Sequence, residues 1–417
     1  MFRTGPLSAE GPDEDAFTLS VAAAERLLAH GPFAGSTVDG IHLVGDFTAE
    51  ADTGLPEALG APHVSVERHG RGLAGLGAAL VAAARRESAG TALVLAADLA
   101  RSSNAEAPAC GAAAVALALQ PGPGLVPTGA GGRRHPTHRP PHADDWVADA
   151  VRHSGLPASG AVGCLYFLAE QSPPVLLAFW RRAQATMPVV DATTAPEGVG
   201  PAPTVAAALG VLDLAGRAQA GEWGVIARVT SDESQFLGLR RTGPLGVIDD
   251  PGPGPASSAL GPPPPRVPES VRAAVSEGAY VPRPRYVENL PSRWRLLAER
   301  CGACGALSFP IRGRCRSCGK SDRLSTEPLP STGTVLAATV VAPGAHPTEF
   351  DPLVAVGGAY GVVLAEMAPG VRVTLQVTDH GPEPLAPGSR ITTQLRRLYP
   401  MEGEWRYGRK ALAATGP

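Results

Sequence analysis

Long apolar runs, cysteines and aromatic side chains are all scarce in this sequence of 417 residues. No apolar stretch approaches the roughly 20 residues that a membrane-spanning helix needs. The N-terminus lacks a cationic start followed by an apolar run, so we expect no signal peptide of the usual kind. Six cysteines do not form the regular framework of a disulfide-rich secreted domain. We therefore expect a cytoplasmic protein with no membrane partner.

Strong net charge is also missing. The formal net charge is only -3, so the whole chain carries no electrostatic signature of a nucleic-acid partner. The length, together with a hydrophobic content of 44%, is enough for two or three domains with their own cores.

Four of the six cysteines form two CxxC pairs, Cys301 with Cys304 and Cys315 with Cys318. Four thiolates complete a tetrahedral Zn²⁺ site and leave no position for water or substrate, so this spacing predicts a structural zinc ion. The alternatives are a pair of disulfides, which a reducing cytosol disfavours, and a redox CxxC motif, which does not explain two such pairs.

Arginines crowd the same region of the chain. Two interpretations stay open: a solvated rim around a small metal module, or a patch that binds phosphates or an acidic carrier protein through the guanidinium fork. Arg293, Arg295 and Arg312 are our candidates for substrate contacts. The arginines concerned are Arg283, Arg285, Arg293, Arg295, Arg300, Arg312, Arg314 and Arg316.

The N-terminal part alternates apolar helical and strand patterns, which predicts a layered α/β domain with two similar halves. We expect strands at residues 41–47, 64–67, 91–100, 110–120, 162–167 and 223–230. We expect helices at residues 13–30, 72–84, 145–153, 176–185 and 203–215. The Gly- and Pro-rich residues 121–142 read as a loop.

A proline-rich linker then separates this domain from the rest of the chain. A helical hairpin, the two CxxC pairs and several short strands follow, and the strands predict a small barrel. The expected boundaries are residues 1–250 for the α/β domain, 251–268 for the linker, 269–325 for the hairpin and ribbon, and 326–417 for the barrel.

The segment NLPSRWRLLAERCGACGALSFPIRGRCRSCG, followed by GTVLAATVV, YGVVLAEM, LAPGSRI and WRYGRKAL, resembles the acyl-CoA-associated zinc-ribbon/OB-fold family. Members of that family accompany thiolases and hydroxymethylglutaryl-CoA synthases. The resemblance covers about residues 280–412 and implies a rubredoxin-like ribbon and an OB-fold barrel. It also implies an accessory role beside a catalytic thiolase- or ketosynthase-like partner, with a coenzyme A thioester or acyl carrier protein bound near the barrel.

Residues 13–249 resemble the thiolase superfamily, in particular its hydroxymethylglutaryl-CoA synthase-like members. The two-half organisation and the segments GTALVLAAD and CGAAAVALAL carry this resemblance. The domain is shorter than usual, and its first strand is missing or reduced to FRTGPL.

The resemblance implies a nucleophilic cysteine at the N-terminus of a buried helix, where the helix dipole lowers the thiol pKa. Here the corresponding stretch is HGRGL, with His69 at the nucleophile position. The residues 166–174 offer no histidine, residues 198–201 offer no asparagine, and TSDE at 230–233 replaces a glycine-rich turn. These departures predict a thiolase-like domain without conventional activity.

Neither remaining cysteine is a convincing substitute. Cys110 precedes one predicted buried strand and Cys164 lies within another, and buried free cysteines usually behave as small apolar side chains. No base is close to either in sequence. An acid-base role for His69 stays open.

Our leading hypothesis is an auxiliary subunit of a thiolase- or ketosynthase-type complex in lipid or polyketide metabolism, working in acyl transfer or carbon-carbon bond formation or cleavage. One alternative is a self-sufficient acyltransferase that uses His69 with Asp232 and Glu233. The other is a nucleic-acid-binding protein, since zinc ribbons and OB-folds also serve that role. Few large rings accompany the barrel strands, which argues against it. They are Tyr360, Tyr399, Trp405 and Tyr407.

Overall fold

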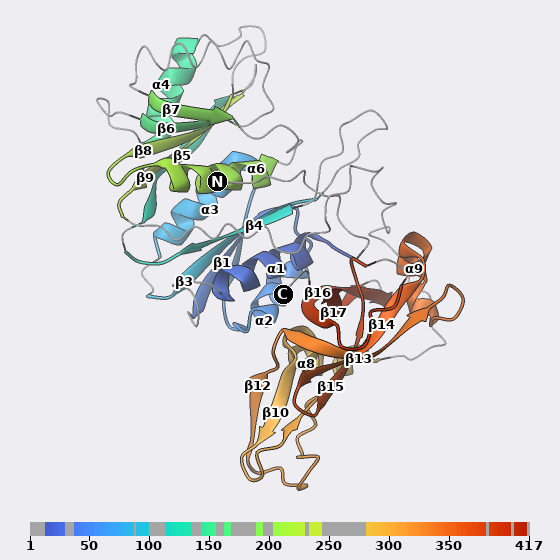
Figure 1. The fold of residues 1–417 in the computed structure, drawn as a ribbon. Coiled ribbons are helices and arrows are strands. Elements are labelled where there is room, and N and C mark those ends of the chain that lie inside the picture. The colour runs from blue at the N-terminus through green and yellow to red at the C-terminus, as the bar shows by residue number, and fades with distance from the viewer. Residues whose placement is uncertain are drawn as a thin grey trace.

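The computed structural model describes most of the α/β region and nearly all of the C-terminal region (Figure 1). The predicted linker 251–268, the predicted helix 176–185 and the FRTGPL segment lie outside the described residues. None of the helices in the described part of the chain is long and apolar enough to cross a membrane. The described residues are 13–29, 37–86, 89–99, 113–122, 124–134, 143–155, 162–167, 189–194, 203–229, 233–243, 281–380, 383–401 and 404–414.

The first half of the α/β domain is a sheet with strand order β2-β1-β3-β4. Strands β1, β2 and β3 are mutually parallel, and β4 runs antiparallel to β3. Helices α1 and α2 pack on one face of this sheet and α3 on the other. The bounds are α1 Ala16–Ala29, β1 Val38–Gly45, α2 Ala51–Ala58, β2 Val66–His69, α3 Gly72–Ala84, β3 Thr91–Asp98 and β4 Ala113–Leu119.

The second half repeats this arrangement. Its sheet has the order β5-β9-β8-β6-β7, so the run β7-β6-β8-β9 matches β2-β1-β3-β4, and the last strand is again antiparallel. The predicted two-half organisation is therefore confirmed. The bounds are β5 Leu125–Arg134, α4 Ala143–Ser154, β6 Val162–Phe167, β7 Val189–Thr194, α6 Pro203–Arg217, β8 Trp223–Val229 and β9 Glu233–Arg241.

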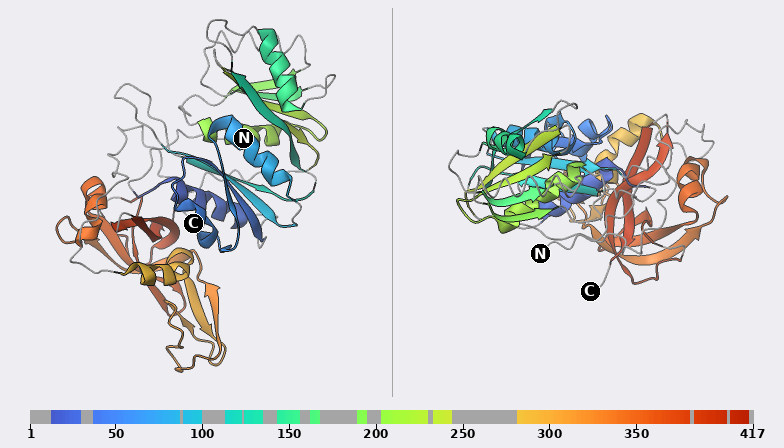
Figure 2. Two further views of the ribbon diagram at one scale, coloured as in Figure 1. Left: turned by 180° about the vertical axis from the view of Figure 1, so that it is seen from behind. Right: turned by 90° about the horizontal axis from the view of Figure 1, so that it is seen from above.

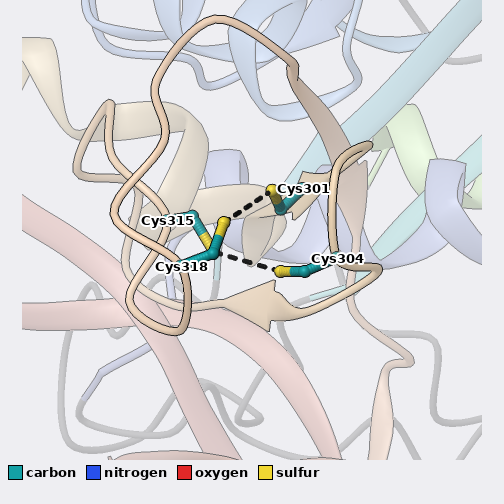
Figure 3. Close-up of side chains that lie close together, drawn as sticks. All are labelled: Cys301, Cys304, Cys315 and Cys318. Atoms are coloured by element: carbon teal, nitrogen blue, oxygen red, sulfur yellow. Dashed lines mark hydrogen bonds between the residues drawn. The ribbon is translucent and has the colours of Figure 1, made fainter.

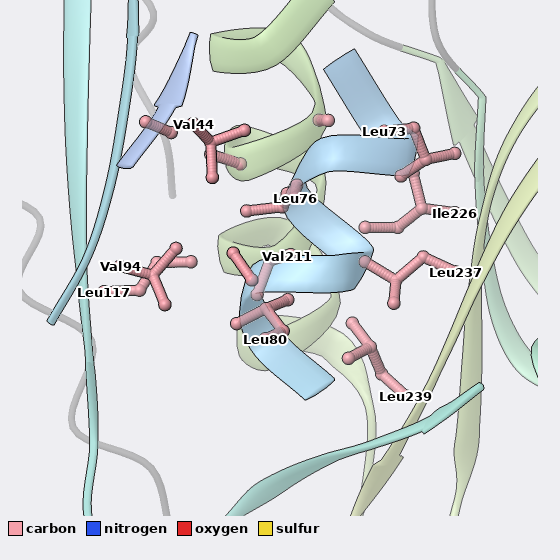
Figure 4. Close-up of a cluster of buried hydrophobic side chains, with 14 of the residues drawn as sticks. Val44, Leu73, Leu76, Leu80, Val94, Leu117, Val211, Ile226, Leu237 and Leu239 are labelled. Carbon is pink, nitrogen blue, oxygen red and sulfur yellow. The ribbon is translucent and has the colours of Figure 1, made fainter. Parts of the chain in front are cut away.

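Helices α3 and α6 lie side by side between the two sheets and form the centre of the domain (Figure 4). Leu76 and Leu80 of α3 belong to one buried cluster with Val94 of the first sheet and Leu237 of the second. A helix covered on both sides must be apolar around its whole circumference, which explains the Gly, Ala and Leu content of α3. This arrangement of layers is the thiolase-like α/β fold that the sequence predicts.

Three strands of the second sheet, β5, β7 and β9, were not predicted from the sequence. Strand β5 lies within residues 121–142, which we expected to be a loop, and that expectation is wrong. Its glycines serve close packing: a Cβ on Gly129 would lie 2.7 Å from the carbonyl oxygen of His153, and one on Gly131 would lie 2.7 Å from the His153 ring. Strand β9 follows the point where we expected the sheet to end.

The C-terminal region begins with two short helices and a three-stranded ribbon of order β11-β10-β12. Five further strands, in the order β15-β14-β13-β16-β17, form the barrel. A bridge between Val377 and Ala411 brings the β15 edge to β17, so the OB-fold barrel is nearly closed. The bounds are α7 Arg283–Glu288, α8 Leu290–Arg295, β10 Leu297–Cys301, β11 Leu307–Ser308, β12 Leu324–Pro328, β13 Thr332–Val341, β14 Tyr360–Ala368, β15 Val371–Gln376, β16 Arg390–Met401 and β17 Glu404–Ala413.

One part of the barrel differs from expectation. We expected strands without helices, but a 3-10 turn at Thr348–Phe350 and helix α9, Asp351–Gly357, precede β14. Asp351 and the proline after it favour a helix start, and this signal outweighs the apolar run LVAV that suggested a strand.

The barrel packs directly on the α/β domain of the same chain, along α1 (Figures 1 and 2). The Phe17 ring forms a cluster with two other aromatic rings, 5.6 Å from Trp294 and 4.9 Å from Tyr407, which are themselves 6.1 Å apart. Beside them, Asp13 accepts a hydrogen bond of 2.8 Å from Lys410 Nζ, and both side chains are buried. The contact therefore combines an aromatic cluster with buried ion pairs.

Candidate functional site

The four CxxC cysteines converge at the tip of the ribbon (Figure 3). Their sulfur atoms all lie within 4.8 Å of one another, and two pairs that join the knuckles, Cys301 with Cys318 and Cys304 with Cys315, are 3.6 Å apart. With Zn–S bonds of about 2.3 Å, a tetrahedral site requires sulfur atoms about 3.8 Å apart. The donor set and its spacing fit a structural zinc ion, and all four cysteines are free thiols.

Backbone amides of the second knuckle favour the thiolate form that a metal needs. The N–H groups of Cys318 and Ser317 point at the Cys315 sulfur and lower the pKa of that thiol to about 6. In the first knuckle, the N–H groups of Ala303 and Cys304 lower the pKa of Cys301. Glu299 fixes the loop before Cys315 by accepting hydrogen bonds from the backbone of Arg312 and Gly313.

The three candidate arginines come from two different elements. Arg293 and Arg295 lie on α8, next to the α/β domain, and their Nε atoms are buried without a hydrogen-bond partner among the described residues. The Arg293 guanidinium lies over the Tyr286 ring, 5.6 Å from its centre. Arg312 is exposed in the ribbon. The guanidinium groups of Arg293 and Arg295 on α8 therefore each have an Nε–H donor that no described residue accepts.

His69 is the last residue of β2, and α3 begins three residues later at Gly72. Its Nε2 atom lies 3.1 Å from Nδ1 of His42, a fully buried residue on β1. The same Nδ1 atom lies 3.6 Å from a carboxylate oxygen of Glu67. Burial lowers the pKa of both imidazoles, and the Glu67 carboxylate opposes that shift. His69 was predicted from the sequence as a candidate site residue, whereas its neighbours His42 and Glu67 were not.

The N-termini of the two central helices meet at a small hydrogen-bonded network. The first backbone N–H of α3, on Gly72, donates to the Thr204 hydroxyl over 3.0 Å. At the start of α6, the N–H groups of Thr204 and Val205 both donate to Asp98 Oδ2 over 2.8 Å. Burial raises the pKa of Asp98, and these N–H groups oppose the shift. These three donors are thus occupied by groups of the chain itself.

The structure describes only some of the other residues considered for catalysis. Glu233 begins β9, and its carboxylate contacts Arg228 and Gln235. Cys164 lies within β6. Asp232 and Cys110 lie outside the described residues, as do the stretches 168–174 and 198–201.

Residues 291–324 match the family described as "ChsH2, rubredoxin-like zinc ribbon domain". This segment therefore resembles a ChsH2-type zinc ribbon. The chain therefore joins an α/β domain of thiolase-like fold to a zinc ribbon that is similar to the ChsH2 family and to an OB-fold barrel.

Three relatives illustrate what the chain is similar to. A DUF35 domain-containing scaffold protein of Methanocaldococcus jannaschii is 27% identical over 110 residues, which are 26% of this chain and 74% of that protein. The solved structure titled "Ltp2-ChsH2(DUF35) aldolase" is 24% identical, with 29% of this chain and 86% of that chain covered and a TM-score of 0.23. The 3-oxoacyl-(acyl carrier protein) synthase III of Pseudomonas aeruginosa is 17% identical, with 57% and 87% covered and a TM-score of 0.41.

Proposed function

We propose that this chain is an auxiliary subunit of a thiolase- or ketosynthase-type system and that the acyl chemistry takes place on a separate catalytic chain. The observation that carries the proposal is the closed network at the central helices. Acyl transfer requires free N–H donors where negative charge develops on the substrate oxygen. Here the Asp98 carboxylate already accepts hydrogen bonds from two N–H groups, those of Thr204 and Val205. Its negative charge would also repel an oxyanion at the same place.

The likeness of part of the chain to a DUF35 scaffold protein supports the same proposal. The ChsH2-type ribbon agrees with it, since an all-thiolate site leaves the metal no open position for chemistry. We propose that the ribbon and α8 form the docking region and that Arg293, Arg295 and Arg312 contact the phosphates of coenzyme A or an acidic carrier protein. Four closely spaced free thiols favour a reducing compartment, so we propose a cytoplasmic location.

A cavity beside the barrel is our candidate for the acyl group. It has a volume of about 340 Å³ and lies between α9 and the start of β14. Phe350, Leu353 and Val354 give it apolar walls, while Lys410 and Asp13 lie at its polar side. Pockets with apolar walls and a few polar groups are typical of small-molecule sites. Filling the cavity with Val354→Trp should weaken acyl-CoA binding in calorimetry, whereas Val287→Trp, at an exposed site on α7, should not.

The decisive experiment is a pull-down from the native host with the tagged full chain, followed by activity assays. The proposal expects a thiolase-like chain with an intact nucleophilic cysteine to be captured, and it expects acyl-CoA turnover only when both chains are present. Turnover by the purified chain alone, abolished by His69→Ala, would instead support a self-sufficient acyltransferase.

A further inference from the structure

We propose that His42, Glu67 and His69 form a second metal site, which binds a divalent transition-metal ion of the Zn²⁺ class. Strands β1 and β2 are parallel neighbours, and in their register His42 lies opposite Glu67. Side chains alternate between the two faces of a strand, so His69, two residues after Glu67, points to the same face. Three metal-binding side chains therefore share one face at the edge of the first sheet.

The spacing of the donor atoms matches a coordination sphere. His42 Nδ1 lies 3.1 Å from His69 Nε2 and 3.6 Å from Glu67 Oε2, and all three donor atoms lie within 4.8 Å of one another. A tetrahedral ion with bonds of about 2.0–2.1 Å to nitrogen and oxygen holds its ligand atoms about 3.3–3.4 Å apart. A single ion can therefore contact all three groups with small movements of the side chains.

Hydrogen bonding alone leaves this cluster incompletely paired. The His42 ring is fully buried. Both polar neighbours of the ring lie at Nδ1, which can carry a single proton. That proton can satisfy either the His69 nitrogen or the Glu67 carboxylate. A cation at the point of convergence would accept a lone pair from all three groups.

The donor set also indicates the kind of metal. Two imidazole nitrogens and one carboxylate oxygen suit Zn²⁺, Co²⁺ or Ni²⁺ better than Mg²⁺ or Ca²⁺. Three protein ligands leave one coordination position for water or a ligand oxygen, unlike the closed thiolate site of the ribbon. Because Glu67 is exposed while His42 is buried, that position faces the solvent side of the cluster.

Cobalt titration of the metal-free full chain, under reducing conditions, separates the two sites. The ribbon should take one Co²⁺ with strong thiolate-to-metal charge-transfer absorption. The proposed site should take a second ion that adds only d–d bands. His69→Ala and Glu67→Gln should remove the second ion and keep the first. His63→Ala, which changes an exposed histidine of the same region outside the cluster, should keep both.

A further variant keeps the test decisive if the β2 substitutions disturb folding. Cys315→Ser leaves the histidine cluster untouched, so it should still bind one ion, with nitrogen and oxygen ligands alone in its X-ray absorption spectrum. Binding of a single ion by the unsubstituted chain, or retention of both ions by His69→Ala and Glu67→Gln, would overturn the proposal. Loss of all tight metal binding in Cys315→Ser would do the same.

Discussion

The buried pair of Asp13 and Lys410 gives a quantitative test of how the barrel sits on its own α/β domain. Their side chains are both 6% exposed, and the ammonium donates to the carboxylate over 2.8 Å. Asp13→Asn keeps the shape of the side chain but leaves the Lys410 charge buried without its partner. Breaking a buried pair in this way costs about 3–5 kcal/mol of the free energy of unfolding.

The assay is urea unfolding of the full chain, followed by its tryptophan fluorescence, to which Trp294 in the aromatic cluster at the same interface contributes. Glu288→Gln is the matched control, because its partner Arg285 is 2.7 Å away but both side chains are exposed. An exposed pair contributes at most about 1 kcal/mol. A loss below about 1 kcal/mol for Asp13→Asn would refute this description of the interface.

The same pair predicts a pH dependence. Burial alone would raise the pKa of Asp13, but Lys410 and Arg396 outweigh burial and lower the pKa below its ordinary value of 3.8. The stabilisation by the carboxylate is therefore fully present above pH 3.8 and is lost as the pH falls through the lower pKa of the folded state. The stability difference between the unsubstituted chain and Asp13→Asn should stay constant from neutral pH to about 4 and shrink below it.

Three further predictions concern the helices and the ribbon. In α6, Gly210→Ala should destabilise the chain by about 1–3 kcal/mol in thermal or urea unfolding, because the added Cβ would lie 2.7 Å from the Tyr166 ring. Gly216→Ala, in the same helix with nothing within 4 Å, should stabilise it by about 0.5–1 kcal/mol, and equal effects would contradict this packing. Asp98→Ala should cost about 1–3 kcal/mol by leaving two buried N–H donors unpaired, and an unchanged midpoint would refute that role. Cys315→Ser should abolish zinc binding at the ribbon and expose the amides of 297–328 to hydrogen exchange; protection equal to that of the zinc-bound chain would contradict a structural metal.

The sequence predicted helices, strands and the metal site correctly where one local pattern of residues determines the structure. Helix α3 was predicted at its observed bounds because a run of Gly, Ala and Leu marks a largely buried helix, although Ala74 and Ala78 on one side of it are exposed. Strand β6 and the zinc ribbon were also predicted, the first from its apolar run and the second from the CxxC spacing. Strand β5 was missed because LVPTGAGGRR carries turn residues, and its glycines are needed for contacts with α4 that no local pattern reveals.

The candidate site could be predicted only in part, because some of its residues are far apart in the sequence and meet only in the folded chain. The four cysteines are close in sequence, so their spacing alone indicated a metal. Asp98 and Thr204, in contrast, are 106 residues apart, and only the packing of the two halves brings them together. His42 and His69 meet through the register of two strands. Contacts of this kind can be inferred only when the order and register of the strands are known.

The measurement that tests the central proposal most directly compares acyl-CoA turnover by three samples: the purified zinc-loaded chain, its thiolase-like partner, and the two together. An auxiliary subunit predicts no turnover by the chain alone, even at high concentration, and a gain in turnover or stability of the partner when both are mixed. Condensation or cleavage of acyl-CoA by the chain alone at ordinary enzymatic rates would contradict the proposal.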